Sequence, residues 1–301
     1  MAVAAQVSYV NMLNRYISQN IQMTLDTVHT DLNNNIVLIG GSGAGKTFRF
    51  VGPNIMQMTS SFVVTDPKGE ICKKYAGLLE MFGYEIKVIN VLNATGMNRS
   101  TRYNPFYYIE NEMDVVKMVT NFMENTKGKN AQTGDAFWTD MAGLLLQAFI
   151  YYAMEKGVEI DGVLHKDFKG VMELVKSVKV EEDDNGVRCP SETDLLFEAY
   201  KSECPDSLAV TSYFKALSGA ADTDRSIIST LNSRTTALQT KEIQELLSGE
   251  DELDIKSIGT RKTAVFCIIP DNDSTYNFLI GMMYTQMFQQ MYYQADFVYD
   301  G

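Results

Sequence analysis

The chain has 301 residues, a length typical of about two domains, and its apolar content of 45% and charged content of 21% are ordinary for a globular protein. Its longest apolar run, 141–154, contains Gln147 and is shorter than the about 20 residues that span a bilayer, so the sequence as written predicts a soluble chain. The four cysteines have neither CxxC nor Cys/His spacing, which argues against a structural zinc site and a disulfide framework.

The net charge of −12 is distributed unevenly along the chain. Residues 1–110 hold nine Lys/Arg against seven Asp/Glu, residues 111–225 hold twelve against twenty-one, and residues 226–301 hold five against ten. A surface that binds nucleic acid through its phosphates is usually basic. We therefore expect the acidic middle segment to meet a basic protein partner, or only to keep the chain soluble, rather than to bind nucleic acid.

Strands and helices alternate in the first 110 residues. Apolar runs bounded by turns predict three buried strands, over 36–39, 62–65 and 85–91. Helical spacing is found over 3–19, 47–58 and 71–82. The second of these helices contains Pro53, so we expect it to kink or to end early, and Gly83 directly follows the third. This alternation predicts a parallel sheet with right-handed crossovers.

From residue 113 to about 247 nearly every pattern is helical. The predicted helices are 113–126, 135–157, 168–178, 191–203, 207–218 and 224–247. Two polar loops interrupt them, 128–134 and 181–190, and we interpret the acidic run in the second as a solvated loop rather than a metal site. Strand character returns over 263–269, before a long helix over 274–296. The sequence thus predicts an α/β fold interrupted by an all-α domain.

The run GGSGAGKT fits the phosphate-binding pattern G-x-x-x-x-G-K-[ST], with a predicted strand before it and a helix after it. The glycines let backbone N–H groups surround a phosphate at the positive end of the helix. Lys46 is placed to reach the β- and γ-phosphates and the Thr47 hydroxyl to ligate Mg²⁺, which makes them the candidate catalytic residues, with Thr47 as the metal ligand. The predicted cofactors are therefore ATP and Mg²⁺. The candidate nucleotide-binding residues in the loop are Gly40, Gly41, Ser42, Gly43, Ala44, Gly45, Lys46 and Thr47.

Two further groups of charged residues follow predicted strands. Asp66 and Lys68 stand at the carboxyl end of the second strand, the edge that faces ligands in parallel α/β sheets, and we add both to the candidate nucleotide-binding residues. Asp66 could contact a metal-bound water, brace a loop, or serve only as a turn residue before Pro67. Asp271 and Asp273 follow the last strand, where capping the next helix is the favoured role.

At this point the residues resemble those of the VirD4/TraG family, the type IV secretion coupling proteins of bacterial conjugation. The resemblance is carried by the phosphate-binding loop, by the block DPKGE about twenty residues after Lys46, and by the turn YNPF at 103–106. The later run that begins TAVFCIIPDND is also similar, so the resemblance covers nearly the whole chain from about residue 20.

The resemblance implies a RecA-like P-loop NTPase sheet interrupted by an all-α domain. We accordingly divide the chain into the first part of the nucleotide-binding domain (1–110), the inserted all-α domain (111–225) and an incomplete return to the nucleotide-binding domain (226–301). Family members are membrane-anchored ATPases at the cytoplasmic face of the bacterial cell membrane, thought to form homo-hexamers. They receive a relaxase–DNA complex and drive its transfer through the secretion channel, and the all-α domain is associated with substrate recognition.

Two features of the family are not found in the sequence: the N-terminal transmembrane helices, and the apolar strand ending in Asp-Glu that positions Mg²⁺ and activates water. We therefore expect a soluble fragment, which could be monomeric, that binds ATP with weak or no hydrolysis. Two alternatives stay open. In one, the chain is an interaction module whose helical insert docks a relaxase or accessory protein, with nucleotide binding incidental. In the other, it is a small-molecule kinase with a helical lid, which is disfavoured because 111–225 contain only Arg188 and Arg225 as arginines.

Overall fold

The computed structural model describes residues 14–91, 100–127, 136–184, 188–217, 220–270 and 274–299. The chain divides into two compact units. The first, which we name the loop unit, comprises residues 1–87 and 258–266, and the second, the helical unit, comprises residues 88–257 and 267–301. The predicted domain boundaries after residues 110 and 225 stay predictions.

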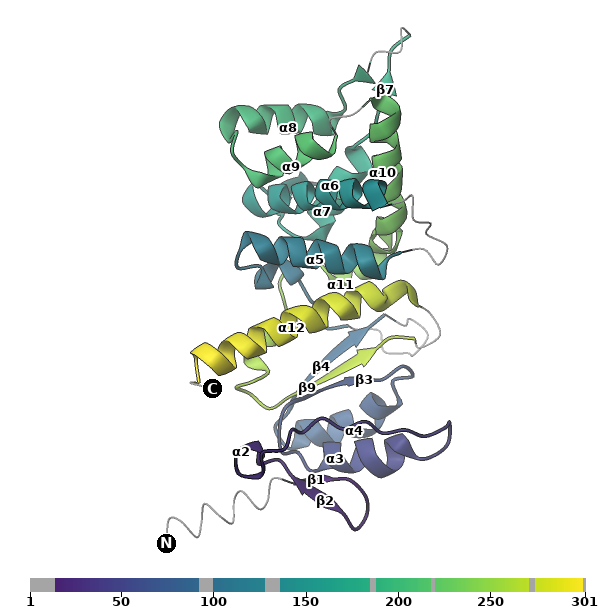
Figure 1. Cartoon of the computed structure of the whole chain (residues 1–301), viewed down its shortest axis with the longest axis vertical. Helices are drawn as coiled ribbons and strands as arrows, with labels where there is room; N and C mark the ends of the chain where they lie inside the picture. The colour runs from purple at the N-terminus through teal and green to yellow at the C-terminus, as the bar shows by residue number, and fades with distance from the viewer. Residues whose placement is uncertain are drawn as a thin grey trace. The chain divides into compact units, whose positions relative to one another are not determined.

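Three strands form the sheet, in the order β3-β9-β4. Their bounds are Phe62–Thr65 for β3, Glu85–Asn90 for β4 and Thr263–Ile268 for β9. The Glu85 N–H donates to the Lys262 carbonyl at 2.8 Å and the Val91 N–H to the Ile268 carbonyl at 3.2 Å, so residue numbers rise together and these strands are parallel. The arrows of all three strands point the same way in Figure 1. Every residue of β9 is buried, whereas in β3 and β4, which were predicted to be buried strands, only Ile89 is.

The loop unit also contains a small hairpin and several short helices. Its remaining elements are β1 (Asn14–Tyr16), β2 (Gln22–Thr24), α2 (Thr27–Thr30), the π-helical turn η1 (Thr47–Val51), α3 (Gly52–Met56) and α4 (Glu70–Met81). Helix α4 ends before Gly83, whose φ of +82° suits glycine. Helical backbone continues from η1 into α3, so Pro53 lies inside it; the turn before Pro53 is π-helical, and α3 ends early, at Met56.

The helical unit contains the helices predicted between residues 113 and 296, with ends that differ by a few residues, except that the predicted single helix 224–247 is divided into two helices and a 3₁₀ turn by the extended Thr240. They are α5 (Glu112–Asn125), α6 (Ala136–Glu155), α7 (Phe168–Ser177), α8 (Glu192–Glu203), α9 (Leu208–Ala216), α10 (Ala221–Thr235), α11 (Lys241–Leu246) and α12 (Asn277–Phe297). Short 3₁₀ turns lie at Pro105–Tyr108, Thr236–Gln239, Ile255–Ser257 and Ser274–Tyr276. The ends are fixed by side chains, since Asn111 with Asp114 and Ser191 with Asp194 form capping boxes at α5 and α8.

Helix α6 is the centre of this unit. It is apolar around most of its circumference, and it packs against α5, α7, α9 and α10, which Figure 1 shows around it. Beside it, the rings of Phe197 and Tyr213 stack with their centroids 4.0 Å apart. The structure thus confirms the predicted α/β fold, a parallel sheet whose strands β4 and β9 are separated in the chain by a long helical region.

Two sequence predictions in the loop unit are wrong. Residues 36–39 form no strand, and Val37 and Ile39 are 85% and 92% exposed. The β-branched run favours a strand, but a strand forms only with a partner, and β9 lies between β3 and β4 instead. The predicted helix 3–19 is wrong where the structure describes it, because Asn14–Tyr16 pairs with Gln22–Thr24 as a strand; the rest of that segment lies outside the described residues.

Sequence analysis also missed two hairpins in the helical unit. Strands β5 (Val158–Ile160) and β6 (Val163–His165) pair around Asp161 and Gly162, both with positive φ. An Asp-Gly pair between apolar residues is a strong hairpin signal that could have been used. The predicted solvated loop 181–190 contains the short strands β7 (Glu181–Glu182) and β8 (Arg188–Cys189). The other predicted loop, 128–134, lies outside the described residues.

Among the described residues, no helix has the length and apolar character that crossing a membrane requires.

Candidate functional site

The loop GGSGAGKT turns sharply at two glycines. Gly43 and Gly45 have φ values of +76° and +84°, a region that side chains with a β-carbon rarely adopt. The Ala44 N–H donates to the Gly41 carbonyl at 3.3 Å, and a β-carbon on Gly40 would lie 3.1 Å from that of Ala44. The loop leads directly into η1, whose first residue is Thr47. The backbone conformation of this loop therefore requires glycine at positions 43 and 45, and the loop directly precedes a helical turn.

Lys46 extends its side chain back over the loop that precedes it. Its Nζ donates to the Gly40 carbonyl at 2.5 Å and to the Gly41 carbonyl at 2.9 Å. Thr47 is exposed at the start of the helical turn. Lys46 lines the cavity on this loop, whereas Thr47 is not among its lining residues, so the predicted contact of Thr47 with Mg²⁺ stays a prediction.

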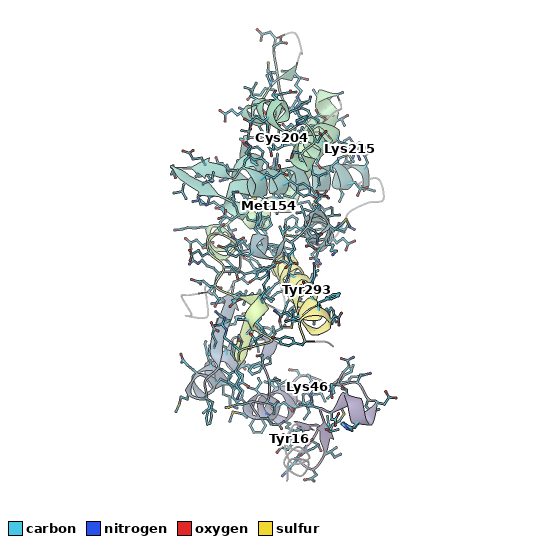
Figure 2. The ribbon with its side chains drawn as sticks, turned by 90° about the vertical axis from the view of Figure 1, so that its left-hand side faces the viewer. Tyr16, Lys46, Met154, Cys204, Lys215 and Tyr293 are labelled. Atoms are coloured by element: carbon cyan, nitrogen blue, oxygen red, sulfur yellow. The ribbon has the colours of Figure 1, made fainter. Side chains whose placement is uncertain are left out.

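A cavity of about 1110 Å³ lies on this loop, wholly within the loop unit. Three cationic side chains line it, those of Lys46, Arg49 and Lys74, and no Asp or Glu is among its described lining residues. Tyr16 and Lys46, which Figure 2 labels, both belong to this wall. The cavity is also aromatic, with rings from Tyr16, Phe48, Phe50 and Tyr75. It therefore offers positive charge beside flat apolar surfaces.

The cavity walls are held by defined contacts. The Asn54 amide of α3 accepts from the Tyr16 N–H at 2.9 Å and donates to the Tyr16 carbonyl at 2.9 Å, which ties strand β1 to α3. From α4, the Lys74 ammonium lies 5.4 Å from the centre of the Phe48 ring and 5.0 Å from that of Tyr75. Segments far apart in the sequence thus complete a site that the loop motif only begins.

Asp66 lies at the turn after β3, as predicted, and is 3% exposed. Its Oδ2 accepts from the Cys72 N–H at 2.8 Å, in the first turn of α4. The residue that precedes this helix is Gly69, which has no side chain to cap it, so Asp66 supplies the acceptor instead. The structure therefore brings Asp66 into a helix-bracing contact. Lys68 is exposed, and neither residue lines the cavity; their predicted contact with nucleotide stays a prediction. Asp271 and Asp273 lie outside the described residues.

The two buried cysteines, Cys72 and Cys267, lie in surroundings that keep their thiols protonated. Burial raises the pKa of Cys72 to about 11, with a further contribution from the negative charge of Asp66. Burial likewise raises the pKa of Cys267 to about 12. Both thiols are therefore protonated at neutral pH and act as small apolar side chains, since the thiolate is the reactive form.

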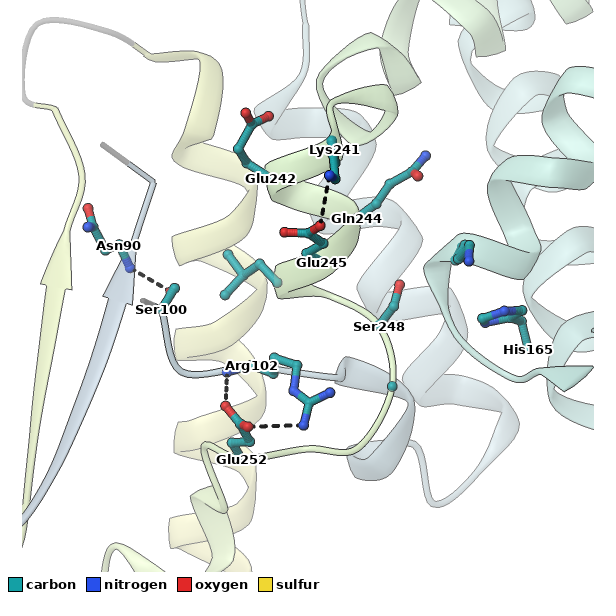
Figure 3. A pocket seen from close by; sticks show the side chains of 13 residues that line it. Asn90, Ser100, Arg102, His165, Lys241, Glu242, Gln244, Glu245, Ser248 and Glu252 are labelled. Carbon is teal, nitrogen blue, oxygen red and sulfur yellow. Dashed lines mark hydrogen bonds and ion pairs between the residues drawn. The ribbon is translucent and has the colours of Figure 1, made fainter. Parts of the chain in front are cut away.

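A second cavity, of about 690 Å³, lies within the helical unit (Figure 3). Besides His165, three cationic side chains line it, those of Arg102, Lys169 and Lys241, against three carboxylates, those of Glu242, Glu245 and Glu252. Arg102 pairs with Glu252 at 3.0 Å and Lys241 with Glu245 at 3.6 Å. Because its positive and negative charges largely compensate one another, this cavity offers an anionic ligand much less net positive charge than the cavity on the loop does.

Comparison with known proteins places the chain in a family. A model of the family described as type IV secretory system conjugative DNA transfer matches residues 9–300. No curated protein matches the sequence. The structure resembles the bacterial conjugative coupling protein TrwBdeltaN70 in an unbound form (15% identity, TM-score 0.45, covering 83% of this chain and 49% of that one). It also resembles the plasmid coupling protein TrwB in complex with ADP and Mg²⁺ (15%, 0.46, 83% and 50%) and with the ATP analogue ADPNP (15%, 0.47, 81% and 49%).

The chain spans about half the length of these solved relatives. The family match rests on nearly every residue of the chain, including the loop, the DPKGE block and the YNPF turn on which the resemblance was based. The resemblance is therefore confirmed, and the chain belongs to the type IV secretory system conjugative DNA transfer family.

Proposed function

We propose that the loop unit binds a nucleoside triphosphate with Mg²⁺, as the nucleotide-binding part of a coupling protein in conjugative DNA transfer. The observation that supports this most is the cavity on GGSGAGKT, where Lys46, Arg49 and Lys74 meet without a carboxylate among the described lining residues. In a chain of net charge −12, such a place attracts a polyanion. The aromatic rings beside the charges suit a base, since they present flat apolar faces.

The glycines and Lys46 of the loop have distinct roles in this proposal. Backbone N–H groups around Gly43 and Gly45 would surround the phosphates, and the start of η1 adds the positive end of a helical turn. Lys46 would exchange its two carbonyl partners for phosphate oxygens, which are stronger acceptors because they are charged. The nucleotide-binding role of the loop residues rests on these contacts.

The residues present fit a magnesium ion that arrives with the nucleotide. Mg²⁺ in nucleotide sites keeps several waters and takes few protein ligands besides the phosphates. The exposed Thr47 hydroxyl beside Lys46 is a ligand of that kind. In the part of the chain that the structure describes, no cluster of three or more His, Cys, Asp or Glu could hold a metal ion by itself. The ion would neutralise phosphate charge, while Lys46 and the loop hold the phosphates in place.

The larger role follows from the family. We propose that the whole protein forms a homo-hexamer at the cytoplasmic face of the membrane, recruits a relaxase–DNA complex and drives its transfer through the secretion channel. Within it, the acidic segment 111–225 would contact a basic relaxase or accessory protein, since its twelve Lys/Arg are outnumbered by twenty-one Asp/Glu.

Calorimetric titration of the 301-residue chain with ATP and Mg²⁺ tests the nucleotide site. We expect saturable binding by the natural chain and none by Lys46→Ala, because that substitution removes the cation that the loop positions. Lys73→Ala is the matched control, since Lys73 is exposed on α4 and does not line the cavity. Equal binding by Lys46→Ala and the natural chain would contradict the proposal.

The partner of the helical unit can be tested on the same chain. We expect a basic relaxase domain to bind it with an affinity that falls as the salt concentration rises. A DNA duplex, which is negatively charged like the segment 111–225, should bind weakly or not at all. Tighter binding of the DNA than of the basic protein would reverse the assignment.

A further inference from the structure

Arg49 lies against the phosphate-binding loop itself. Its N–H donates to the Gly45 carbonyl at 2.7 Å, so the backbone of the first helical turn carries it over the loop. Its Cδ and Nε atoms lie 3.2 Å from the position that a β-carbon on Gly45 would occupy. The side chain therefore uses the space that the glycine leaves open, and it lines the same cavity as Lys46.

Arg49 also differs from the other arginines in the described part of the chain, because its side chain has no hydrogen-bond or ion-pair partner there. Four of the others pair with carboxylates: Arg102 with Glu252, Arg188 with Asp194 and Asp224, Arg225 with Asp222 and Glu182, and Arg261 with Glu85. The remaining two, Arg15 and Arg234, donate to backbone carbonyls. Among the described arginines, Arg49 is thus the one whose guanidinium has neither a carboxylate nor a carbonyl partner, and it lies at the edge of the phosphate-binding loop.

We infer that Arg49 is a second phosphate-binding cation of the site, acting together with Lys46. This inference rests on the proposed nucleotide function. The two cations differ in kind: Lys46 is a mobile point charge, whereas a guanidinium presents a planar fork of donors that matches two phosphate oxygens. The position of its side chain beside Gly45 fits a contact with the phosphate groups. Because its backbone N–H already donates to the Gly45 carbonyl, that contact would be made by the guanidinium.

The test compares two substitutions at one position. Arg49→Met keeps most of the side-chain length but removes charge and donors, and Arg49→Lys keeps the charge without the fork. In calorimetry with ADP and Mg²⁺, we expect Arg49→Met to weaken binding about ten- to a hundredfold, the effect of losing a charge-assisted hydrogen bond. Arg49→Lys should weaken it less. Lys73→Met, which removes an exposed charge from the same unit outside the cavity, should change it by less than about twofold.

Ionic strength separates a phosphate contact from a change of cavity shape. If Arg49 meets the phosphates, the affinity of Arg49→Met should fall less steeply with added salt than that of the natural chain, because one charge pair is missing. Thermal unfolding without nucleotide shows whether each variant is folded. The inference is overturned if Arg49→Met binds ADP as tightly as the natural chain. It is also overturned if both variants weaken binding equally with the salt dependence unchanged. Absence of binding by the natural chain would instead refute the nucleotide site as a whole.

Discussion

Arg188 of the helical unit and Arg49 of the loop unit have opposite surroundings. In the helical unit, Arg188 forms ion pairs with Asp194 and with the fully buried Asp224. These pairs connect the β7–β8 hairpin to helices α8 and α10. In the loop unit, Arg49 and Lys46 share a cavity that no described carboxylate lines. A buried charge with a partner stabilises a structure only while the pair is intact, whereas an exposed charge without one is available to a ligand. The contrast separates residues that maintain the fold from those that we propose bind nucleotide.

The aromatic residues allow the largest test of that contrast. Phe197 is fully buried and stacks on Tyr213, whereas Phe48 is 73% exposed in the cavity wall. We expect Phe197→Ala to lower the free energy of unfolding by about 3–5 kcal/mol, the cost of a cavity left by a large aromatic side chain. Phe48→Ala should change it by less than about 0.5 kcal/mol. Denaturant titrations of both variants measure the difference, and similar losses would mean that the loop unit depends on its aromatic residues as the helical unit does.

The same substitution at two arginines should give opposite results. Arg188→Met leaves Asp224 buried without its cation, so we expect the free energy of unfolding to fall by about 3 kcal/mol, with nucleotide affinity unchanged. Arg49→Met should leave the free energy of unfolding within about 0.5 kcal/mol of the natural value. Urea unfolding and calorimetry on the two variants decide this. Loss of stability in Arg49→Met comparable to that in Arg188→Met would remove the distinction.

The smallest expected effect is on acid stability. Burial by itself would raise the pKa of Asp194, but hydrogen bonds from Ser191 and Tyr213 and the charge of Arg188 outweigh it, so the pKa is lowered. A carboxyl whose pKa is lower in the folded state contributes stability that is complete above its unfolded pKa, about 4, and is lost as pH falls through the folded value. The free energy of unfolding should therefore decrease below about pH 4, and less steeply in Asp194→Asn. Parallel curves for the two proteins would show that Asp194 does not carry this dependence.

Much of the fold could be predicted from local patterns. The helices of the helical unit follow from the spacing of apolar residues and from capping residues such as Asn111 and Ser191. Both signals involve residues only a few positions apart in the sequence. Strand 36–39 was predicted on equally good local grounds, yet it does not form, because pairing is decided by distant strands. The Asp161–Gly162 hairpin was missed although its turn signal is local.

For the candidate site, the sequence by itself determined the phosphate-binding loop and the family, because both depend on residue types at fixed spacing. Glycines at 43 and 45 adopt the positive φ that their pattern implies, and Lys46 and Thr47 follow them onto a helical turn. Tertiary structure alone decided that Tyr16 and Lys74 complete the cavity, that Asp66 braces α4, and that the guanidinium of Arg49, unlike those of the other described arginines, has neither a carboxylate nor a carbonyl partner. The reason is physical: backbone conformation responds to neighbouring residues, whereas charge pairing and cavity walls depend on segments that only folding brings together.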